Sequence, residues 1–354
     1  MASVAELDLS LVDHANNLPP ESVVYGRSLM MQAVRQKVEK VAGTNVPVLI
    51  QGESGTGKEI LAKLLHHHAP WSDGPLVKVH CPAIPSTLME SELFGYEKGA
   101  FTGAYGTKPG RVEMAHRGTL FLDEIAELDP GLQAKLLQLL QDGQFCRIGA
   151  QVDKRVEVRV VCATNRRLDR EIKAGSFRQD LYYRINVVNM QLPPLRERRE
   201  DIPDLVDYFL VAFGVMFKCP IRPLSDPLMQ LLQKYNWPGN IRELENLVKR
   251  YAILGTEEAI KSDLIGAPSD PFDPEVPANG AISLKKLTQQ AVLEVERNVI
   301  LKALQAHHWN RKRTAHALSI SYRALLYKIR QAGLPARSNL GVGEPGRKPV
   351  AFAA

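Results

Sequence analysis

Cysteine is scarce in this sequence of 354 residues, which has four in total and none in CxxC spacing. They are Cys81, Cys146, Cys162 and Cys219. This scatter argues against a zinc site built on cysteine pairs and against a disulfide framework, and it favours a reducing compartment. Long apolar runs are also missing, so the sequence predicts no membrane-spanning helix. The first residues lack a basic start followed by an apolar core, which argues against a secretory signal. We therefore expect a cytoplasmic protein.

The charge excess is mild, because 45 Lys and Arg residues stand against 39 Asp and Glu, for a net charge of +6. This balance permits nucleic-acid binding without demonstrating it. The length exceeds that of one compact core and predicts two or three domains. Shifts in composition predict six segments: a short N-terminal segment at 1–21, an α/β block at 22–192, a helical block at 193–262, a proline-rich linker at 263–281, a helical module at 282–335 and a disordered tail at 336–354.

Hydrophobic patterning predicts an α/β fold for the larger part of the chain. Four apolar runs have the length of buried strands: 46–50, 76–79, 119–122 and 158–162. Amphipathic stretches separate them, and this alternation is typical of a parallel sheet covered on both faces. Pro193 and Pro194 end the pattern, and the segments 204–217 and 241–254 that follow have helical spacing. We therefore expect a small helical subdomain after the sheet.

A phosphate-binding loop is predicted at Gly52–Lys58, with the sequence GESGTGK. It follows the strand at 46–50 and precedes a helix at 60–67, so its backbone amides and the helix N-terminus would face phosphate oxygens. The lysine would reach the terminal phosphates of a nucleotide. A glycine-rich turn without a ligand is the alternative, but strand, spacing, lysine and helix all agree. Glu59 stands where the general motif has Ser or Thr to hold magnesium.

Two adjacent acids, Asp123 and Glu124, end the apolar run at 119–122. Alone, this pattern often marks only a strand that enters solvent. About 65 residues after a phosphate loop, it favours catalysis, with Asp123 holding Mg²⁺ through water and Glu124 activating the attacking water.

Five segments together resemble the AAA+ domain of bacterial sigma-54-dependent transcription activators. They are GESGTGKE at 52–59, ELFGYEKGAFTGA at 92–104, GTLFLDEI at 118–125, FRQDLYYR at 177–184 and WPGNIRELEN at 237–246. The resemblance covers about residues 22–255, and GAFTGA is its most specific part. It implies an α/β AAA+ P-loop ATPase with a helical lid.

The resemblance also implies roles for particular residues. The segment Gly99, Ala100, Phe101, Thr102, Gly103 and Ala104 would be a surface loop that contacts the sigma factor, with Phe101 and Thr102 at the contact. Arg178 and Arg184 would reach the γ-phosphate bound by a neighbouring subunit of a ring, usually a hexamer. The expected ATP-binding residues are Gly52, Glu53, Ser54, Gly55, Thr56, Gly57, Lys58, Glu59, Thr164, Asn165, Arg242, Tyr25 and Gly26.

His80 departs from the family pattern, which usually has an asparagine at this position. That asparagine bonds the catalytic glutamate and couples hydrolysis to the GAFTGA loop. We expect His80 to donate a similar bond and to alter the coupling, with a dependence on pH near 6.5. A tolerated substitution without functional effect is the alternative.

The C-terminal module is predicted to bind double-stranded DNA. Residues 284–307, 311–318 and 322–331 have the pattern of three helices, with Asn310 and Ser321 as caps of the second and third. The stretch resembles the Fis-type helix-turn-helix that ends this activator family, and such modules usually bind as dimers. The expected DNA-binding residues are Arg311, Lys312, Arg313, Ser321, Tyr322, Arg323, Tyr327, Lys328 and Arg330.

These features predict an ATP-dependent activator that remodels sigma-54 RNA polymerase from the closed to the open complex, with ATP and Mg²⁺ as cofactors. Another AAA+ remodeller, or a DNA-bound regulator with a vestigial ATPase, remains an alternative. About twenty residues precede the predicted AAA+ domain, too few for a receiver or sensor domain. We therefore expect regulation by a separate protein or a truncated chain.

Overall fold

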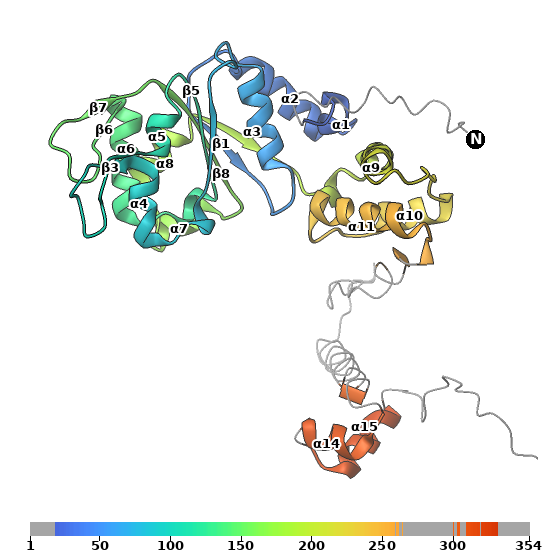
Figure 1. Ribbon diagram of the computed structural model, residues 1–354. Coiled ribbons are helices and arrows are strands. Elements are labelled where there is room, and N and C mark those ends of the chain that lie inside the picture. Colours follow the sequence, from blue (N-terminus) through green and yellow to red (C-terminus); the bar gives the residue numbers. More distant parts are fainter. Residues whose placement is uncertain are drawn as a thin grey trace, which may run out of the picture. The chain divides into compact units, whose positions relative to one another are not determined.

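The computed structural model describes residues 18–258, 260–261, 264, 300, 303–304, 309–318 and 320–331. The chain forms two compact units, residues 1–267 and 268–354 (Figure 1). The division falls within the predicted linker at 263–281. Among the described residues, no helix is long and apolar enough to cross a membrane.

A five-stranded parallel sheet forms the centre of the first unit, with strand order β2-β5-β8-β1-β9. Its strands are β1 (Val48–Gln51), β2 (Leu76–His80), β5 (Gly118–Asp123), β8 (Val158–Thr164) and β9 (Val188–Gln191). Four of them confirm the predicted strands. The sequence prediction missed β9, which is short and lies at the edge of the sheet, so that only Met190 among its residues is buried. An edge strand with so little buried surface has a weak hydrophobic signal.

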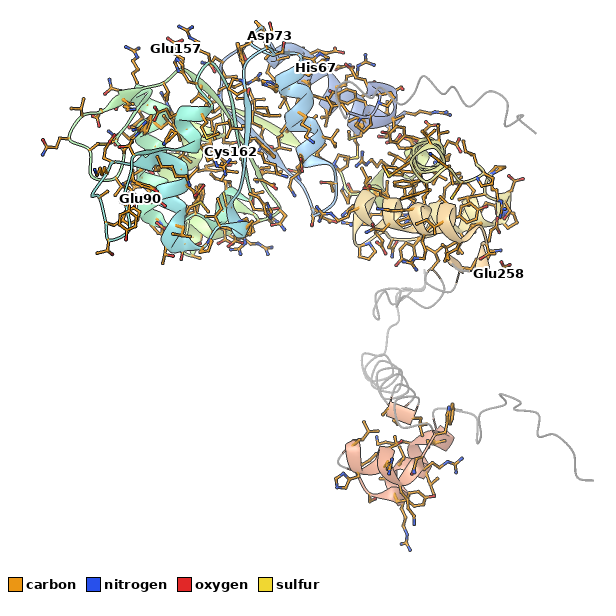
Figure 2. All side chains as sticks on the ribbon, viewed as in Figure 1. His67, Asp73, Glu90, Glu157, Cys162 and Glu258 are labelled. Atoms are coloured by element: carbon orange, nitrogen blue, oxygen red, sulfur yellow. The ribbon has the colours of Figure 1, made fainter. Side chains whose placement is uncertain are left out.

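The two faces of the sheet carry separate hydrophobic cores. Side chains of neighbouring strand residues point to opposite faces, so Phe121 packs on one face and Leu120 and Leu122 on the other. Figure 2 labels Cys162, which is fully buried in the sheet. Helices α1 (Glu21–Tyr25), α2 (Leu29–Val41) and α3 (Lys58–His67) contribute to the first core. The second core includes α4 (Ser86–Phe94), α5 (Arg111–Met114), α6 (Pro130–Asp142), α7 (Leu168–Lys173) and α8 (Gln179–Ile185).

Two short hairpins interrupt the α/β pattern. The first pairs β3 (Gly95–Tyr96) with β4 (Lys108–Pro109), and the second pairs β6 (Gln144–Phe145) with β7 (Lys154–Arg155). The segment GAFTGA connects the strands of the first hairpin, which lies between α4 and α5. Single 3₁₀ turns occupy η3 (Cys81–Ala83), η4 (Ile125–Glu127), η5 (Leu195–Glu197) and η6 (Arg199–Asp201).

The predicted helical subdomain contains α9 (Ile202–Phe217), α10 (Asp226–Lys234) and α11 (Asn240–Leu254). Its own core includes Trp237, which is fully buried and donates a hydrogen bond from Nε1 to Leu232 O at 2.8 Å. This satisfied donor lets a large amphipathic side chain fill the centre of the lid.

The second unit contains α14 (Arg311–Ala317) and α15 (Tyr322–Gln331). Both predicted caps are confirmed: Asn310 Oδ1 accepts from Arg313 N at 3.2 Å, and Ser321 Oγ accepts from Ala324 N at 3.1 Å. Most of the helix predicted at 284–307 lies outside the described residues. The described core consists of Ile300, Leu304, Ala315, Leu325 and Ile329.

Candidate functional site

The predicted phosphate loop connects β1 to α3, at the carboxyl end of the parallel sheet. Lys58 begins α3 and is only 7% exposed. Its Nζ donates to Gly52 O at 2.9 Å and to Glu53 O at 3.2 Å, so its ammonium lies inside the loop. A buried lysine held by loop carbonyls is suited to exchange these partners for phosphate oxygens.

A cavity of about 490 Å³ opens above this loop. One wall is polar and contains Lys58, Asp123 and Glu124, whereas Val24 and Phe209 belong to an apolar wall. This volume lies in the range of small-molecule sites, roughly 300–1,000 Å³. A polar wall beside an apolar wall fits a nucleotide, whose phosphates and base have the same contrast.

The acid pair lies at the end of β5, where Glu124 adopts a left-handed backbone with φ of 58°. Glu124 Oε2 accepts from Asn165 N at 2.9 Å, and Oε1 lies 3.5 Å from Lys58 Nζ. A non-glycine residue with positive φ costs free energy and is worth a functional explanation. Here it turns Glu124 away from the strand direction, so that its carboxylate joins the cavity.

The structure gives His80 a different partner from the expected one. Its Nδ1 lies 2.8 Å from Asp123 Oδ2, and not on Glu124. The cause is the sheet register, in which His80 and Asp123 are paired across β2 and β5. Burial raises the pKa of the Cys81 thiol to about 12, and the negative charge of Asp123 adds to this effect.

The residues beside the cavity fit a magnesium ion held mainly by phosphate and water. Asp123 presents one carboxylate oxygen bonded to His80 and a second, Oδ1, to which no described residue donates. The Glu59 carboxylate binds Lys78 Nζ at 2.6 Å and Lys63 Nζ at 3.2 Å instead. Across the described ranges, no group of three or more His, Cys, Asp or Glu side chains could cage a metal. Mg²⁺ suits such a site, because it keeps several waters and takes one or two carboxylates.

Two predicted adenine-pocket residues do not line this cavity. Tyr25 is 1% exposed and packs into the core beneath α2, where burial raises its pKa to about 12. Gly26 turns the chain with φ of 55°, against the Asp201 carboxylate. The preceding residues Val23 and Val24 line the cavity instead. Tyr25 and Gly26 thus lie outside the wall of the cavity, and their contact with a nucleotide stays a prediction.

Two further residues that were predicted to bind nucleotide are Thr164 and Arg242. Thr164 is buried at the end of β8, and its Oγ1 accepts from Arg166 N at 3.0 Å. Arg242 on α11 lines the cavity, where its Nη1 donates to Ser54 Oγ at 3.2 Å. The lid therefore places a guanidinium directly against the phosphate loop.

A hydrogen-bonded clamp between the loop and the lid was not foreseen from the sequence. Arg196 Nη1 and Nη2 bind both carboxylate oxygens of Glu53, at 2.9 and 2.6 Å. These bonds lower the pKa of Glu53. Asn240 Nδ2 donates to Glu53 Oε2 at 3.1 Å and to Ser54 O at 3.0 Å. Gly55 touches the lid so closely that an added Cβ would lie 2.3 Å from Gly239 O. The position of the lid is thus coupled to the phosphate loop.

Buried Arg198 extends this contact into the cavity wall. Its Nη2 donates to Thr56 O at 2.9 Å, and its Nε has no hydrogen-bond partner among the described residues. Burial lowers its pKa to about 10, an effect that Asp201 opposes.

Arg178 and Arg184 do not line the cavity of their own chain. Arg178 precedes α8 and pairs with Asp180, with Nη2 and Oδ2 2.6 Å apart. Arg184 donates from Nη2 to Leu140 O at 3.0 Å. Both side chains are exposed. Their placement leaves them accessible to another molecule.

The GAFTGA segment forms a compact turn that exposes its centre. Gly99 N donates to Ala104 O at 2.9 Å, and positive φ angles at Gly99 and Gly103 permit this closure. Ala104 is buried and Ala100 half-buried, whereas Thr102 and Gly103 are exposed. Phe101 is 45% exposed. One side of the Phe101 ring therefore remains open at the surface.

Aromatic and charged neighbours of this loop also escaped the sequence prediction. The Phe101 ring packs on Tyr96, and Tyr105 is 90% exposed beside the loop. Beneath it, Arg147 binds Glu97 Oε1 at 2.9 Å and Glu113 Oε2 at 2.5 Å. Arg147 belongs to the second hairpin, so this charge pairing joins the two hairpins. These contacts connect residues 50 and 34 positions apart, beyond what sequence spacing reveals.

The predicted DNA-binding residues of the second unit are mostly accessible. Arg311 and Lys328 are half-buried, and the Arg330 side chain lies outside the described residues. The exposed members are Lys312, Arg313, Ser321, Tyr322, Arg323 and Tyr327.

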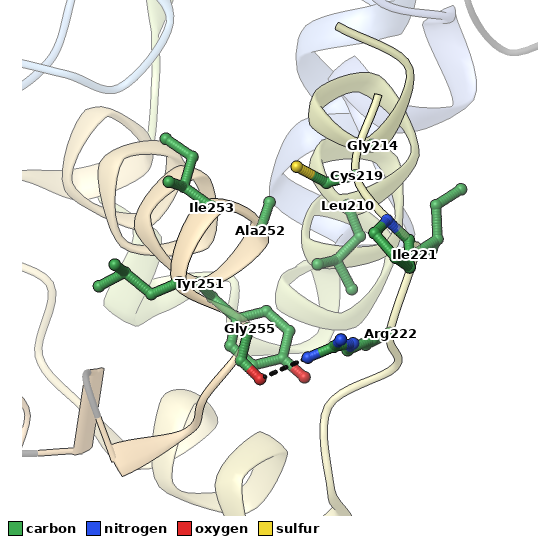
Figure 3. A pocket seen from close by; sticks show the side chains of 11 residues that line it. Leu210, Gly214, Cys219, Ile221, Arg222, Tyr251, Ala252, Ile253 and Gly255 are labelled. Carbon is green, nitrogen blue, oxygen red and sulfur yellow. Dashed lines mark hydrogen bonds between the residues drawn. The ribbon is translucent and has the colours of Figure 1, made fainter. Parts of the chain in front are cut away.

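A smaller cavity of about 110 Å³ lies inside the lid (Figure 3). Leu210 and Ile253 belong to its wall, where Arg222 Nη1 also donates to Gly255 O at 3.0 Å. It lacks the convergent charged groups of the larger cavity. The chemistry of the first unit is therefore concentrated at the phosphate loop.

The fold and this site define a P-loop ATPase of the AAA+ class with a helical lid, joined to a helix-turn-helix module. Family models match three stretches: the sigma-54 interaction domain at 24–191, the AAA+ ATPase lid domain at 196–270, and the bacterial regulatory protein, Fis family, at 292–331. The chain belongs to the sigma-54-dependent transcriptional activator family.

Curated relatives and a solved structure agree with this family assignment. The chain is 42% identical over 318 residues to the Nif-specific regulatory protein of Azotobacter vinelandii, covering 90% of this chain and 60% of that protein. It is 43% identical over 305 residues to the regulatory protein AtoC of Escherichia coli K12, covering 86% and 66%. NtrX from Brucella abortus, solved in complex with ATP, is 35% identical with a TM-score of 0.64, covering 88% of this chain and 69% of that one.

Proposed function

We propose that this protein is an ATP-driven transcription activator that opens promoter complexes of sigma-54 RNA polymerase. The observation that carries this proposal is the half-exposed Phe101, presented by the GAFTGA turn on the same unit as the cavity above the phosphate loop. An accessible aromatic on a glycine-flanked turn is suited to anchor a protein contact. Phe101 and Thr102 would contact the sigma factor, with Gly99, Ala100, Gly103 and Ala104 shaping the turn.

In the proposed reaction, the loop Gly52–Lys58 binds the phosphates of ATP and Arg242 contacts them from the lid. Mg²⁺, when bound beside Asp123, would neutralise charge on the phosphate oxygens. Glu124 accepts a proton from the attacking water, and the Asn165 amide holds one of its oxygens in place. Lys58 must leave Glu124, 3.5 Å away, when it binds the terminal phosphate, which frees the carboxylate for this task.

The proposed assembly is a ring, in which Arg178 and Arg184 stabilise the γ-phosphate charge of a neighbouring subunit. Their exposure and their absence from their own cavity support this role. The ring predicts that ATPase activity per subunit rises with protein concentration, because each site needs two subunits. Concentration-independent activity that survives Arg178→Ala would contradict it.

The second unit would bind upstream double-stranded DNA as a dimer through α14 and α15. This proposal rests on the family relationship and on the exposed basic residues described above.

The decisive experiment is open-complex formation on a sigma-54 promoter with ATP, comparing the wild type, Thr102→Ala and Thr44→Ala. Thr44 is an exposed threonine in the loop after α2 and serves as the matched control. We expect activation by the wild type and the control but not by Thr102→Ala, while all three hydrolyse ATP. A wild type that hydrolyses ATP without opening the complex would overturn the proposal.

A further inference from the structure

We propose that His80 is a positioning residue for Asp123, and that it controls metal binding rather than the water-activating Glu124. This inference rests on the proposed function, because it assigns Asp123 to Mg²⁺. It differs from the sequence expectation, in which His80 acts on the glutamate.

The geometry begins with the sheet. His80 and Asp123 are the last residues of β2 and β5 and are paired in register, so both side chains start from the same edge. Their contact joins Nδ1 to Oδ2 at 2.8 Å. The Asp123 side chain is 16% exposed and that of His80 is 45% exposed. A well-packed carboxylate is therefore held by a more accessible imidazole at the mouth of the cavity.

The chemistry of this contact fixes the direction of the hydrogen bond. An ionised carboxylate only accepts, so the His80 Nδ1 must carry the hydrogen. The bond occupies Oδ2 and restrains rotation of the Asp123 carboxylate. Oδ1 then remains for the water shell of a metal, and outer hydrogen bonds of this kind orient metal-binding carboxylates.

Glu124 has separate supports, from the Asn165 amide on the β8 side and from Lys58. No described contact joins His80 to Glu124. Loss of the imidazole would therefore release Asp123 and leave the supports of Glu124 in place. Asp123 is therefore supported by a residue of β2, whereas Glu124 is supported by Asn165 after β8 and by Lys58 on α3.

Side-chain geometry supplies a matched set of variants. In asparagine the amide nitrogen is attached to Cγ, as Nδ1 is in histidine, so His80→Asn retains a donor at the same place. His80→Gln moves the donor one carbon farther out. His80→Leu keeps a similar bulk and removes the donor.

The test measures Mn²⁺ binding to the full chain loaded with ATPγS, by electron paramagnetic resonance. We expect His80→Leu to weaken Mn²⁺ binding by about 10-fold, the lower end of the effect of losing an outer hydrogen bond, because Asp123 acts through water. His80→Asn should bind Mn²⁺ like the wild type, and His80→Gln should resemble His80→Leu. Glu124→Gln, the matched control, should lose hydrolysis while it retains Mn²⁺ affinity.

Equal Mn²⁺ affinity in His80→Leu and the wild type would overturn the inference. So would an asparagine variant as weak as the leucine variant, because the imidazole would then act by packing alone. Reduced hydrolysis with unchanged Mn²⁺ affinity in His80→Leu would place the effect on Glu124. A wild type that binds no Mn²⁺ with ATPγS would instead contradict the proposed ATPase itself.

Discussion

The rings of Phe101 and Tyr96 pack edge to face, with centroids 4.9 Å apart. Tyr96 ends the first strand of the hairpin, and Phe101 stands at the centre of the turn that the hairpin presents. Contact with the Tyr96 ring restrains the Phe101 side chain, which the flexible residues Gly99 and Gly103 would otherwise leave free to move. A restrained aromatic binds with a smaller loss of conformational entropy.

Removal of the Tyr96 ring should weaken promoter opening without affecting ATP hydrolysis. We expect Tyr96→Leu to lower open-complex formation roughly 2- to 10-fold, since an aromatic pair contributes about 0.5–1.5 kcal/mol beyond its buried area. Promoter opening and ATP hydrolysis would be measured on the same preparation. Tyr105→Leu, at the 90% exposed neighbour, is the control. A parallel fall in hydrolysis would show that Tyr96 supports the fold instead.

The water-activating role of Glu124 predicts separation of binding from catalysis. Glu124→Gln preserves the side-chain shape and an oxygen that accepts from the Asn165 amide, but removes the base. We expect hydrolysis to fall by about 100-fold or more, while ATP still binds. Phosphate release and titration with a fluorescent ATP analogue measure the two properties. Retention of wild-type hydrolysis would exclude Glu124 as the base.

The lid clamp predicts a loss of stability and of nucleotide affinity on substitution of Asn240. This residue has φ of 53° and accepts from Leu195 N at 2.8 Å. Asn240→Gly keeps the conformation but leaves that buried amide without its acceptor, so the free energy of unfolding should fall by roughly 1–3 kcal/mol. Asn240→Ala should lose more, because alanine is strained at positive φ. Denaturant titrations would compare them, and equal losses would refute the backbone argument.

The pairing of Glu53 with Arg196 predicts a pH-dependent contribution to stability. The hydrogen bonds from Arg196 lower the folded pKa of Glu53 below its ordinary value of 4.5. The stabilisation is thus fully present above pH 4.5 and is lost as pH falls through the lowered pKa. The stability difference between the wild type and Glu53→Gln should be largest at neutral pH and shrink in acid. Denaturation curves at several pH values would measure it; a constant difference would contradict the pairing.

The exposed guanidinium of Arg323, in the first turn of α15, should contact DNA phosphate. We expect Arg323→Ala to weaken binding of upstream DNA and to reduce the dependence of log affinity on log salt by about 1. Fluorescence anisotropy across a salt series would report both values. An unchanged salt slope together with altered sequence preference would indicate a base contact instead.

Sequence patterns predicted most of the fold because burial on both faces leaves a clear signal. Four apolar runs, of which Leu120, Phe121 and Leu122 form one, predicted four of the five strands, and β9 was missed because its edge position buries little. The phosphate loop was predictable because its residues form one short stretch between a strand and a helix. The partners of that stretch in the lid, Arg196 and Asn240, were not, since they lie 143 and 187 residues away.

The sequence by itself determined the class of this protein: its ordered motifs specify an AAA+ core with a Fis-type module, because each motif is local and its spacing reflects the element that carries it. Only the tertiary structure decided how these motifs act together. The register of β2 and β5 joined His80 to Asp123, and the turn of α1 buried Tyr25 away from the cavity. Such pairings depend on register and side-chain direction, which packing of the whole sheet and its helices settles.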